Sequence, residues 1–384
     1  MTVDLEERPA APDPDPPRPP DEPKAGFGTQ LLRIGVSLVV PVVAIGALYF
    51  AANILLDEDA NRGLVVLMAI LIGVFGVFGL YYGMDWLINR LPERHRDKVR
   101  PFAFVGPAIV ILGLFLLYPT FDTIYRSFRN SDNTTWVGVD NFVEIFTSSE
   151  FLIALRNSVG WVIVVPLFSV LIGLGFAVLA DRLSSKGESF SKTFIFMPMA
   201  ISFVGASIVW RFIYNFRPEG FGDQIGLLNG VWTAIGNEPV AWLLQEPWNN
   251  LYLMVILIWL QTGFAMVILS AAIKSVPEDI IEAARIDGAT EFQVFRKVTI
   301  PSISSTIVVV ATTVIITVWK VFDIVFVMTG GRFNTSVVAE QMVTQFFTFR
   351  QSGIGAALAV VLLVAIIPLM IANVRRFREQ EETR

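Results

Sequence analysis

Residues 276–301 read VPEDIIEAARIDGATEFQVFRKVTIP and form a polar stretch between two long apolar ones. Pro277 suits the first turn of a helix, because the backbone N–H that proline lacks would have no hydrogen-bond partner within the helix at that position. The acidic residues that follow, among them Glu282, complement the positive end of the helix dipole. Gly288 permits the left-handed turn that commonly ends such a helix. The pattern predicts a short helix and a turn, and apolar residues every three positions from Phe292 onward predict a second helix.

The rest of the chain has the composition of an integral membrane protein. Of its 384 residues 54% are hydrophobic and 16% are charged, whereas soluble domains carry about a quarter charged residues. Eight stretches of at least eighteen residues lack Asp, Glu, Lys, Arg and His, and each is long enough to cross a bilayer as a helix. They are Ile34–Leu56, Gly63–Met84, Pro101–Phe121, Asn157–Ala180, Thr193–Trp210, Pro247–Ile273, Ser302–Trp319 and Gln351–Val374. We expect an all-α integral membrane fold with eight transmembrane helices.

The distribution of charge predicts the orientation of these helices. Basic residues crowd one short loop and follow the last apolar stretch; they are Arg90, Arg94, Arg96, Lys98 and Arg100, and then Arg375, Arg376 and Arg378. Positive charge favours the cytoplasmic side of a membrane protein. Eight crossings then place both termini and the 276–301 stretch in the cytoplasm.

We expect four parts along the chain. Residues 1–30 are rich in Pro and charge and form a disordered cytoplasmic tail, not a cleaved signal peptide. Residues 31–100 hold an accessory hairpin of two transmembrane helices and the basic loop. Residues 101–374 hold a six-helix core that includes the polar loop at 274–303. Residues 375–384 form a charged cytoplasmic tail.

The sequence lacks the residues for several kinds of site. It has no cysteine and one histidine, so we expect no disulfide and no metal site. No Gly-x-x-x-x-Gly-Lys-Ser/Thr motif occurs, so this device for holding ATP phosphates is missing. We expect no catalytic residues and no nucleic-acid partner.

The polar loop resembles the cytoplasmic signature loop of ABC importer permeases. The resemblance rests on Glu282–Ala284, then Gly288, then Val298–Pro301 after nine intervening residues. The last element departs conservatively from the Ile-x-Leu-Pro that the family prefers. In the family the loop forms a short helix that docks on a separate ATPase subunit.

Other segments resemble the carbohydrate-uptake branch of these permeases. Asn141-Phe142, residues 155–158 and the loop's place between the fourth and fifth core helices are similar to that branch. Two extra N-terminal helices are a feature of its maltose-type first permease subunit. Residues 329–335 and 371–378 resemble its α-glucoside permeases.

The resemblance implies a permease subunit in a bacterial or archaeal plasma (inner) membrane. Its partners would be a second homologous permease, two ATPase subunits and an extracytoplasmic sugar-binding protein, besides membrane lipid. ATP and Mg would bind the ATPases, and this chain would hold no cofactor. The implied ATPase-coupling residues are Glu282, Ala283, Ala284, Arg285, Asp287, Gly288 and Pro301. The alanines suit close packing, while Arg285 and Asp287 suit polar contacts to the ATPase.

Polar and aromatic residues within the apolar stretches are candidates for the solute path, because unneeded polar groups are costly in lipid. They are Ser202, Trp259, Gln261, Gly263, Thr313, Thr317, Lys320 and Asp323. By position, Trp259, Gly263, Thr313 and Thr317 correspond roughly to the maltose-type site. Structural roles compete with this interpretation: threonines bond back to their own helix, and a Lys-Asp pair can extend toward the membrane surface.

The implied substrate is a neutral sugar, an α-glucoside such as trehalose, maltose or sucrose. Glycerol phosphate or another polyol is the alternative, although a phosphate would favour more positive charge than Arg211 and Lys320 supply. A membrane enzyme for lipid-linked sugars would need paired carboxylates at a membrane face. An ion-driven secondary transporter would show broken helices in an inverted repeat, and we find no such symmetry.

Overall fold

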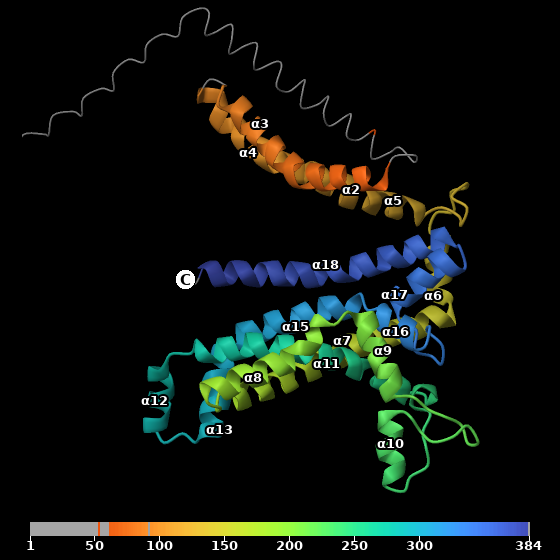
Figure 1. Cartoon of the computed structure of the whole chain (residues 1–384), viewed down its shortest axis with the longest axis vertical. Coiled ribbons are helices and arrows are strands. Elements are labelled where there is room, and N and C mark those ends of the chain that lie inside the picture. The colour runs from red at the N-terminus through yellow and green to blue at the C-terminus, as the bar shows by residue number, and fades with distance from the viewer. Residues whose placement is uncertain (1–52, 54–60, 91–92, 383–384) are drawn as a thin grey trace, which may run out of the picture. The chain divides into compact units, whose positions relative to one another are not determined.

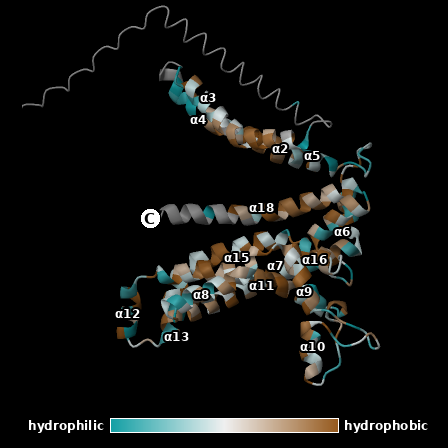
Figure 2. Cartoon of the chain, in the orientation of Figure 1, coloured by the Kyte–Doolittle hydropathy of each residue, from teal (hydrophilic) through white to brown (hydrophobic). Residues whose placement is uncertain are grey.

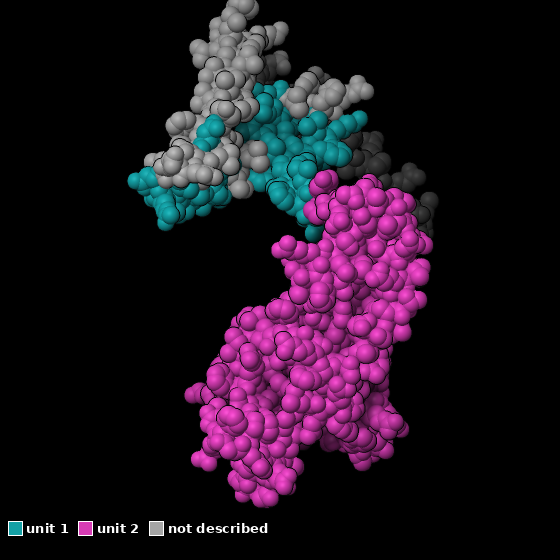
Figure 3. All heavy atoms as spheres, turned by 90° about the vertical axis from the view of Figure 1, so that its right-hand side faces the viewer, with its two compact units in different colours: residues 1–116 teal, residues 117–384 magenta. Residues whose placement is uncertain are grey.

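The computed structural model describes residues 53, 61–90 and 93–382. The predicted tail at residues 1–30 lies outside them, as does the predicted helix Ile34–Leu56 apart from Asn53. Within the described ranges every regular element is a helix, which confirms the all-α fold. One isolated β-bridge joins Arg129 and Trp136. The chain divides into two compact units, Met1–Leu116 and Leu117–Arg384 (Figures 1 and 3).

The described part of the first unit is a helical hairpin. Its elements are α2 (Arg62–Leu71), a π-helical turn (Ile72–Gly76), α3 (Val77–Ile88) and α4 (Glu93–Leu112). α3 and α4 run antiparallel: the rings of Tyr81 and Phe104 stack with centroids 5.9 Å apart, and Arg100 pairs with Asp85 at 3.5 Å. The two units divide at Leu116–Leu117, inside the apolar helix Arg96–Arg126. The accessory boundary near residue 100 stays a prediction.

The second unit is a bundle of helices. A π-helical turn (Gly113–Leu117) leads into it. Its helices are α5 (Tyr118–Arg126), α6 (Asp140–Thr147), α7 (Ser149–Ala180), α8 (Ser185–Phe196), α9 (Phe203–Ile213), α10 (Leu227–Ala234), α11 (Trp248–Lys274), α12 (Glu278–Ile286), α13 (Glu291–Val294), α14 (Ile300–Ser302), α15 (Ser304–Trp319), α16 (Asp323–Met328), α17 (Val338–Val343) and α18 (Ser352–Glu382). Short 3-10 segments cover Met197–Ala200 and Trp242–Leu244, and π-helical turns cover Phe295–Thr299 and Thr344–Thr348.

Four helices in the described ranges are long and apolar enough to cross a membrane, or up to six if two bent pairs each count as one span. The four are Val65–Ile88, Arg96–Arg126, Ser149–Ala180 and Trp248–Lys274. In the last predicted span, the apolar part of α18 is the shorter stretch Ser352–Pro368. The total of eight helices and the side on which the termini lie therefore stay predictions.

One predicted span, Thr193–Trp210, is bent, and a second bend lies where the polar loop joins the predicted span Ser302–Trp319. Ser185–Ala200 meets Phe203–Ile213 at 101°, and Glu291–Ser302 meets Ser304–Trp319 at 67°. At the first bend, Pro198 lies in a 3-10 turn and Ile201 is extended, with φ −86° and ψ 137°. Ser202 then starts a new helix by accepting a hydrogen bond from the amide of Gly205 at 3.1 Å. The bend arises because the backbone must leave the helical conformation between two capped segments.

The packing of α7 on α11 forms the centre of the bundle, where Figure 2 shows apolar residues along α7, α11 and α15. Trp161 on α7, Leu257 on α11 and Val314 on α15 are fully buried in one cluster. Closer to α12, a Cβ added to Gly173 would lie 2.6 Å from the Cβ of Ala265 and 2.9 Å from the backbone nitrogen of Met266. The two helices therefore cross backbone to backbone where small residues face each other.

Buried side-chain amides hold the loop between α16 and α17. Asn157 on α7 donates to the carbonyls of Asn334 at 2.7 Å and Ser336 at 2.9 Å, and Asn249 on α11 donates to that of Phe333 at 2.7 Å. Phe333 and Asn334 have positive φ values of 57° and 54°. Non-glycine residues adopt this conformation at a cost, so the amide clamp stabilises a strained loop.

The Gly173 crossing gives a first prediction. Gly173→Leu should lower the thermal stability of the detergent-solubilised protein by several degrees, because overpacking a close contact costs about 1–3 kcal/mol. Thermal unfolding followed by size-exclusion chromatography measures the change. Gly175→Leu is the matched control, because nothing lies within 4 Å of an added Cβ there. Equal stability of the two variants would contradict the packing account.

Candidate functional site

α12 and its turn have the local structure predicted from the polar loop. α12 begins after Pro277 and ends at Ile286. Gly288 has a φ of +81°, and its amide donates to the carbonyl of Arg285 at 3.0 Å while the amide of Ala289 donates to that of Ala284 at 3.1 Å. This pair of bonds is the usual left-handed ending of a helix. The glycine therefore fixes the angle at which the chain leaves α12.

An ion pair and a cap hold α12 and α13 as one helix-turn-helix. The guanidinium of Arg285 donates to both carboxylate oxygens of Glu291, at 2.8 and 3.2 Å. These hydrogen bonds from Arg285 to Glu291 raise the pKa of Arg285 above its ordinary value. Thr290 and Gln293 form a reciprocal cap at the start of α13. The coupling residues predicted from sequence do not include Thr290, Gln293 or Glu291, although the Thr-x-x-Gln spacing is typical of a helix N-terminal cap.

α12 has no buried residue. Ile281 packs toward the bundle, whereas Ile286 is 86% exposed and Phe292, on α13, is 69% exposed. Of the predicted coupling residues, Ala284 is half-buried, and Glu282, Ala283, Arg285, Asp287, Gly288 and Pro301 are exposed. Figure 1 shows α12 at the end of the bundle remote from α6 and α17. An exposed surface with large apolar side chains is typical of a protein-binding site.

Pro301 lies apart from the turn, in α14 just before the 67° bend into α15. A cavity of about 480 Å³ separates the helix-turn-helix from the end of α7, with Asp181 and Arg182 on one side and Ile281 and Arg285 on the other. The polar loop thus stands partly away from the bundle.

A network of charged side chains joins α8 and α11 to the end of α7, next to this cavity. Asp181 accepts from Lys192 at 3.3 Å and from the hydroxyl of Ser270 at 2.7 Å. Glu188 pairs with Lys192 at 2.5 Å and also with Lys274. The predicted residues include none of these five. The four-residue spacing of Glu188 and Lys192 indicates one pair, but the links to α7 and α11 require the folded chain.

Of the predicted solute-path residues, Trp259 lines a cavity that the other seven do not line. Trp259 lines an apolar cavity of about 530 Å³ together with Trp210, Pro198 and Thr262. The rings of Trp210 and Trp259 meet edge to face, with centroids 5.8 Å apart. Trp210 and Thr262 are absent from the predicted residues, since only the fold brings the two tryptophans together.

Three other candidates, Gln261, Gly263 and Ser202, lie outside the lining of this cavity. Gln261 is buried, and a Cβ on Gly263 would lie 2.5 Å from the carbonyl oxygen of Ile195, so Gly263 is where α11 passes the end of α8. Ser202 caps α9 at the 101° bend. Neither Ser202 nor Gln261 nor Gly263 lines the cavity.

The remaining candidates lie on or just after α15. The hydroxyls of Thr313 and Thr317 donate to the carbonyls of Val309 and Thr313, at 2.9 and 3.1 Å, which is the structural role weighed above. Lys320 is exposed and Asp323 is half-buried. Among the described residues, no ion pair within 4 Å joins them to each other.

Comparison with known proteins finds a matching family model and similar permeases. Residues 169–378 match the family model described as "Binding-protein-dependent transport system inner membrane component". The chain is 50% identical over 281 residues to the osmoprotective compounds uptake permease protein GgtC of Synechocystis, covering 73% of this chain and 100% of that one. It is 41% identical over 347 residues to the alpha-glucoside transport system permease protein AglF of Rhizobium meliloti, covering 90% and 97%.

A solved structure shares the fold. It is a bacterial alginate ABC transporter in complex with an alginate pentasaccharide-bound periplasmic protein, with a TM-score of 0.63 and 23% identity over 73% of this chain and 96% of that one. The resemblance seen in the polar loop is therefore confirmed. The chain belongs to the family of binding-protein-dependent transport system inner membrane components, the permeases of ABC importers.

Proposed function

We propose that this chain is a transmembrane permease subunit of an ATP-driven sugar importer, and that the α12 helix-turn-helix transmits the motion of separate ATPases. The proposal rests on the exposure of α12, which has no buried residue. Arg285–Glu291 and the Gly288 turn fix its shape, while the side chains of Ile286 and Phe292 are largely exposed. Such a surface suits docking by a second protein.

The proposed assembly has two homologous permeases, two ATPases and an extracytoplasmic sugar-binding protein. Eight spans with both termini in the cytoplasm place α12 on the side where ATP is available. The basic residues flanking the spans support this orientation. ATP and Mg bind the ATPases in this scheme, and this chain supplies the path and the docking loop.

We propose that alternating access uses two features of the bundle: the charged network at the end of α7 and the two bent helix pairs. The network around Asp181 ties α8 and α11 to the end of α7, so that end moves as one body. The 101° and 67° bends leave α9 and α15 at an angle to the segments before them. We propose that force on α12 rotates this body and moves the walls of the cavity at Trp259. In this scheme Arg285 is held by Glu291, and Asp287, Ala283 and Ala284 meet the ATPase.

The proposed substrate is a neutral α-glucoside such as trehalose, maltose or sucrose. The cavity at Trp259 and Trp210 has no charged lining residue, which favours a neutral solute over glycerol phosphate. Aromatic faces suit sugar rings, and the Trp210 indole N–H has no partner in the described chain. The likeness to AglF supports this class.

An osmoprotective solute is the second candidate. The 50% identical relative is named for uptake of osmoprotective compounds. The uncharged cavity fits a neutral solute of that kind equally well. Uptake assays with a panel of α-glucosides, polyols and zwitterionic osmolytes separate the candidates.

The cavity generates a prediction for transport. Trp259→Ala should raise the KM for sugar uptake about tenfold, equivalent to about 1.4 kcal/mol, because the aromatic face is lost. Trp259→Phe should retain most of the affinity. Trp248→Ala, at an exposed residue outside the cavity, is the control and should leave KM unchanged. An unchanged KM in Trp259→Ala would remove this cavity from the solute path.

The α12 turn generates a prediction for coupling. Gly288→Val should reduce the sugar taken up per ATP hydrolysed, because a β-branched residue in the left-handed region costs about 1–3 kcal/mol and shifts the turn. No atom lies within 4 Å of an added Cβ, so the backbone conformation alone causes the effect. Gly288→Asn should do less harm, since Asn tolerates this conformation. Transport and ATPase assays in proteoliposomes measure the ratio, and a normal ratio in Gly288→Val would contradict a coupling role.

The function as a whole is tested by purifying this chain from its native membrane in mild detergent and identifying the associated proteins by mass spectrometry. We expect an ATPase and a second permease with its own Glu-Ala-Ala loop. Recovery of this chain alone, while other membrane complexes stay intact, would contradict the proposal.

A further inference from the structure

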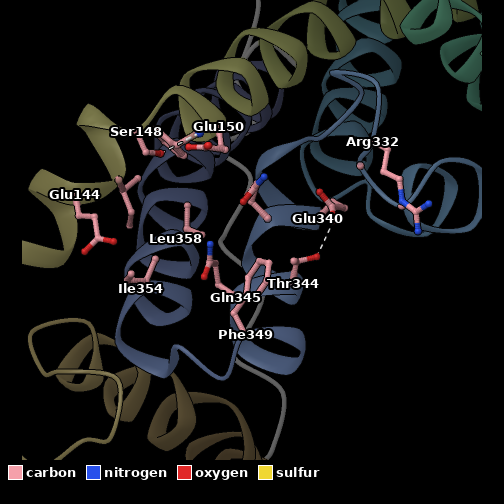
Figure 4. A pocket seen from close by; sticks show the side chains of 15 residues that line it. Glu144, Ser148, Glu150, Arg332, Glu340, Thr344, Gln345, Phe349, Ile354 and Leu358 are labelled. Carbon is pink, nitrogen blue, oxygen red and sulfur yellow. Dashed lines mark hydrogen bonds between the residues drawn. The ribbon is translucent and has the colours of Figure 1, made fainter. Parts of the chain in front are cut away.

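A second polar cavity lies at the start of α7, at the end of the bundle opposite α12. Its volume is about 460 Å³. Its walls come from α6, the start of α7, the loop before α17, α17 itself and the start of α18. Figure 4 shows Glu144, Ser148 and Glu150 on one side and Glu340 with Thr344 on the other. The proposed coupling and solute-path residues contribute nothing to it.

Glu340 is the buried charged residue of this cavity, with 3% of its surface exposed. Its two carboxylate oxygens accept from the hydroxyls of Ser336 at 2.5 Å and Thr344 at 2.7 Å. A Cβ on Gly331 would collide with the same carboxylate, so backbone covers it on that side. The carboxylate is therefore held in a fixed position against the cavity wall.

This carboxylate has no counter-charge. No basic side chain lies within 4 Å of it in the described residues. Arg332 also lines the cavity, but in Figure 4 its side chain extends away from Glu340. The exposed carboxylates of Glu144 and Glu150 make the lining more negative. A buried carboxylate without a cation is costly, so a cationic group is the expected occupant.

The walls indicate which kind of cation fits. Apolar side chains of Ile145, Phe151, Ile354 and Leu358 line the cavity, and Phe349, 60% exposed, lies at its edge. Lysine and arginine combine an apolar stem with a charged head. A metal ion instead takes several oxygen ligands, and the described residues contain no group of three or more His, Cys, Asp or Glu that could hold one.

We propose that this cavity receives a lysine or arginine side chain of the extracytoplasmic sugar-binding protein, with Glu340 as its counter-ion. The inference rests on the proposed function, which supplies that partner and places this end outside the cytoplasm. The loop that covers Glu340 is clamped by Asn157 and Asn249. Such preorganisation lowers the cost of binding a partner.

The test uses the assembled transporter in lipid nanodiscs, titrated with the purified binding protein of the same system. Glu340→Gln keeps the size of the side chain and removes its charge. It should weaken binding at least tenfold and reduce the dependence of Kd on salt. Glu238→Gln removes an exposed carboxylate outside this cavity and should change Kd less than twofold. Equal Kd values for Glu340→Gln and the unaltered complex would overturn the inference.

Competition on the unaltered complex tests the same site without a mutation. N-acetyl-lysine amide and N-acetyl-arginine amide should displace the binding protein, whereas N-acetyl-norleucine amide at equal ionic strength should not. Displacement by Na⁺ or Ca²⁺ at the same concentrations as the amides would assign the cavity to an inorganic cation and overturn the inference. If the unaltered complex binds no extracytoplasmic protein, the proposed function and the inference both fail. Binding that ignores Glu340 and the amides refutes the inference alone.

Discussion

The close approach of α7 and α11 is the interaction on which the rest of the bundle depends. Gly173 lets the two backbones cross next to Ala265, and farther from α12 the fully buried Trp161 and Leu257 fill the space between the helices. In lipid, where apolar side chains gain little by leaving their surroundings, such close packing is the main source of helix association. In the second unit, the elements at both ends of the bundle contact this pair.

The two ends of the pair carry different chemistry. At the α12 end, charged side chains around Asp181 join α7 to α8 and α11. At the other end, amides of Asn157 and Asn249 hold a strained loop beside a cavity that contains Glu340. In the proposed importer, the loop at one end of this helix pair meets the ATPase and the cavity at the other end meets the extracytoplasmic partner.

The polar loop could be predicted from sequence because its signals are local. The helix after Pro277 and the left-handed Gly288 depend on residues next to them in the chain, and both agree with the structure. The bend before Ser202 was missed because hydropathy reports where apolar residues lie, not whether the helix through them is continuous. The cavity that joins Trp210 to Trp259 was also missed, since residues distant in sequence meet there only after folding.

If α12 docks on an ATPase in the cytoplasm, a single engineered thiol on this helix becomes inaccessible when the ATPase binds. The chain contains no cysteine, so Ala283→Cys gives one reactive site on the exposed helix. With this chain and its permease partner alone in inside-out vesicles, a membrane-impermeant maleimide should label that site, and adding the ATPases should protect it. Ser185→Cys, exposed in α8 at the same end, should react equally in both cases. Labelling of Ala283→Cys that the ATPases leave unchanged, or that occurs only from the extracytoplasmic side, would show that α12 does not dock on a cytoplasmic ATPase.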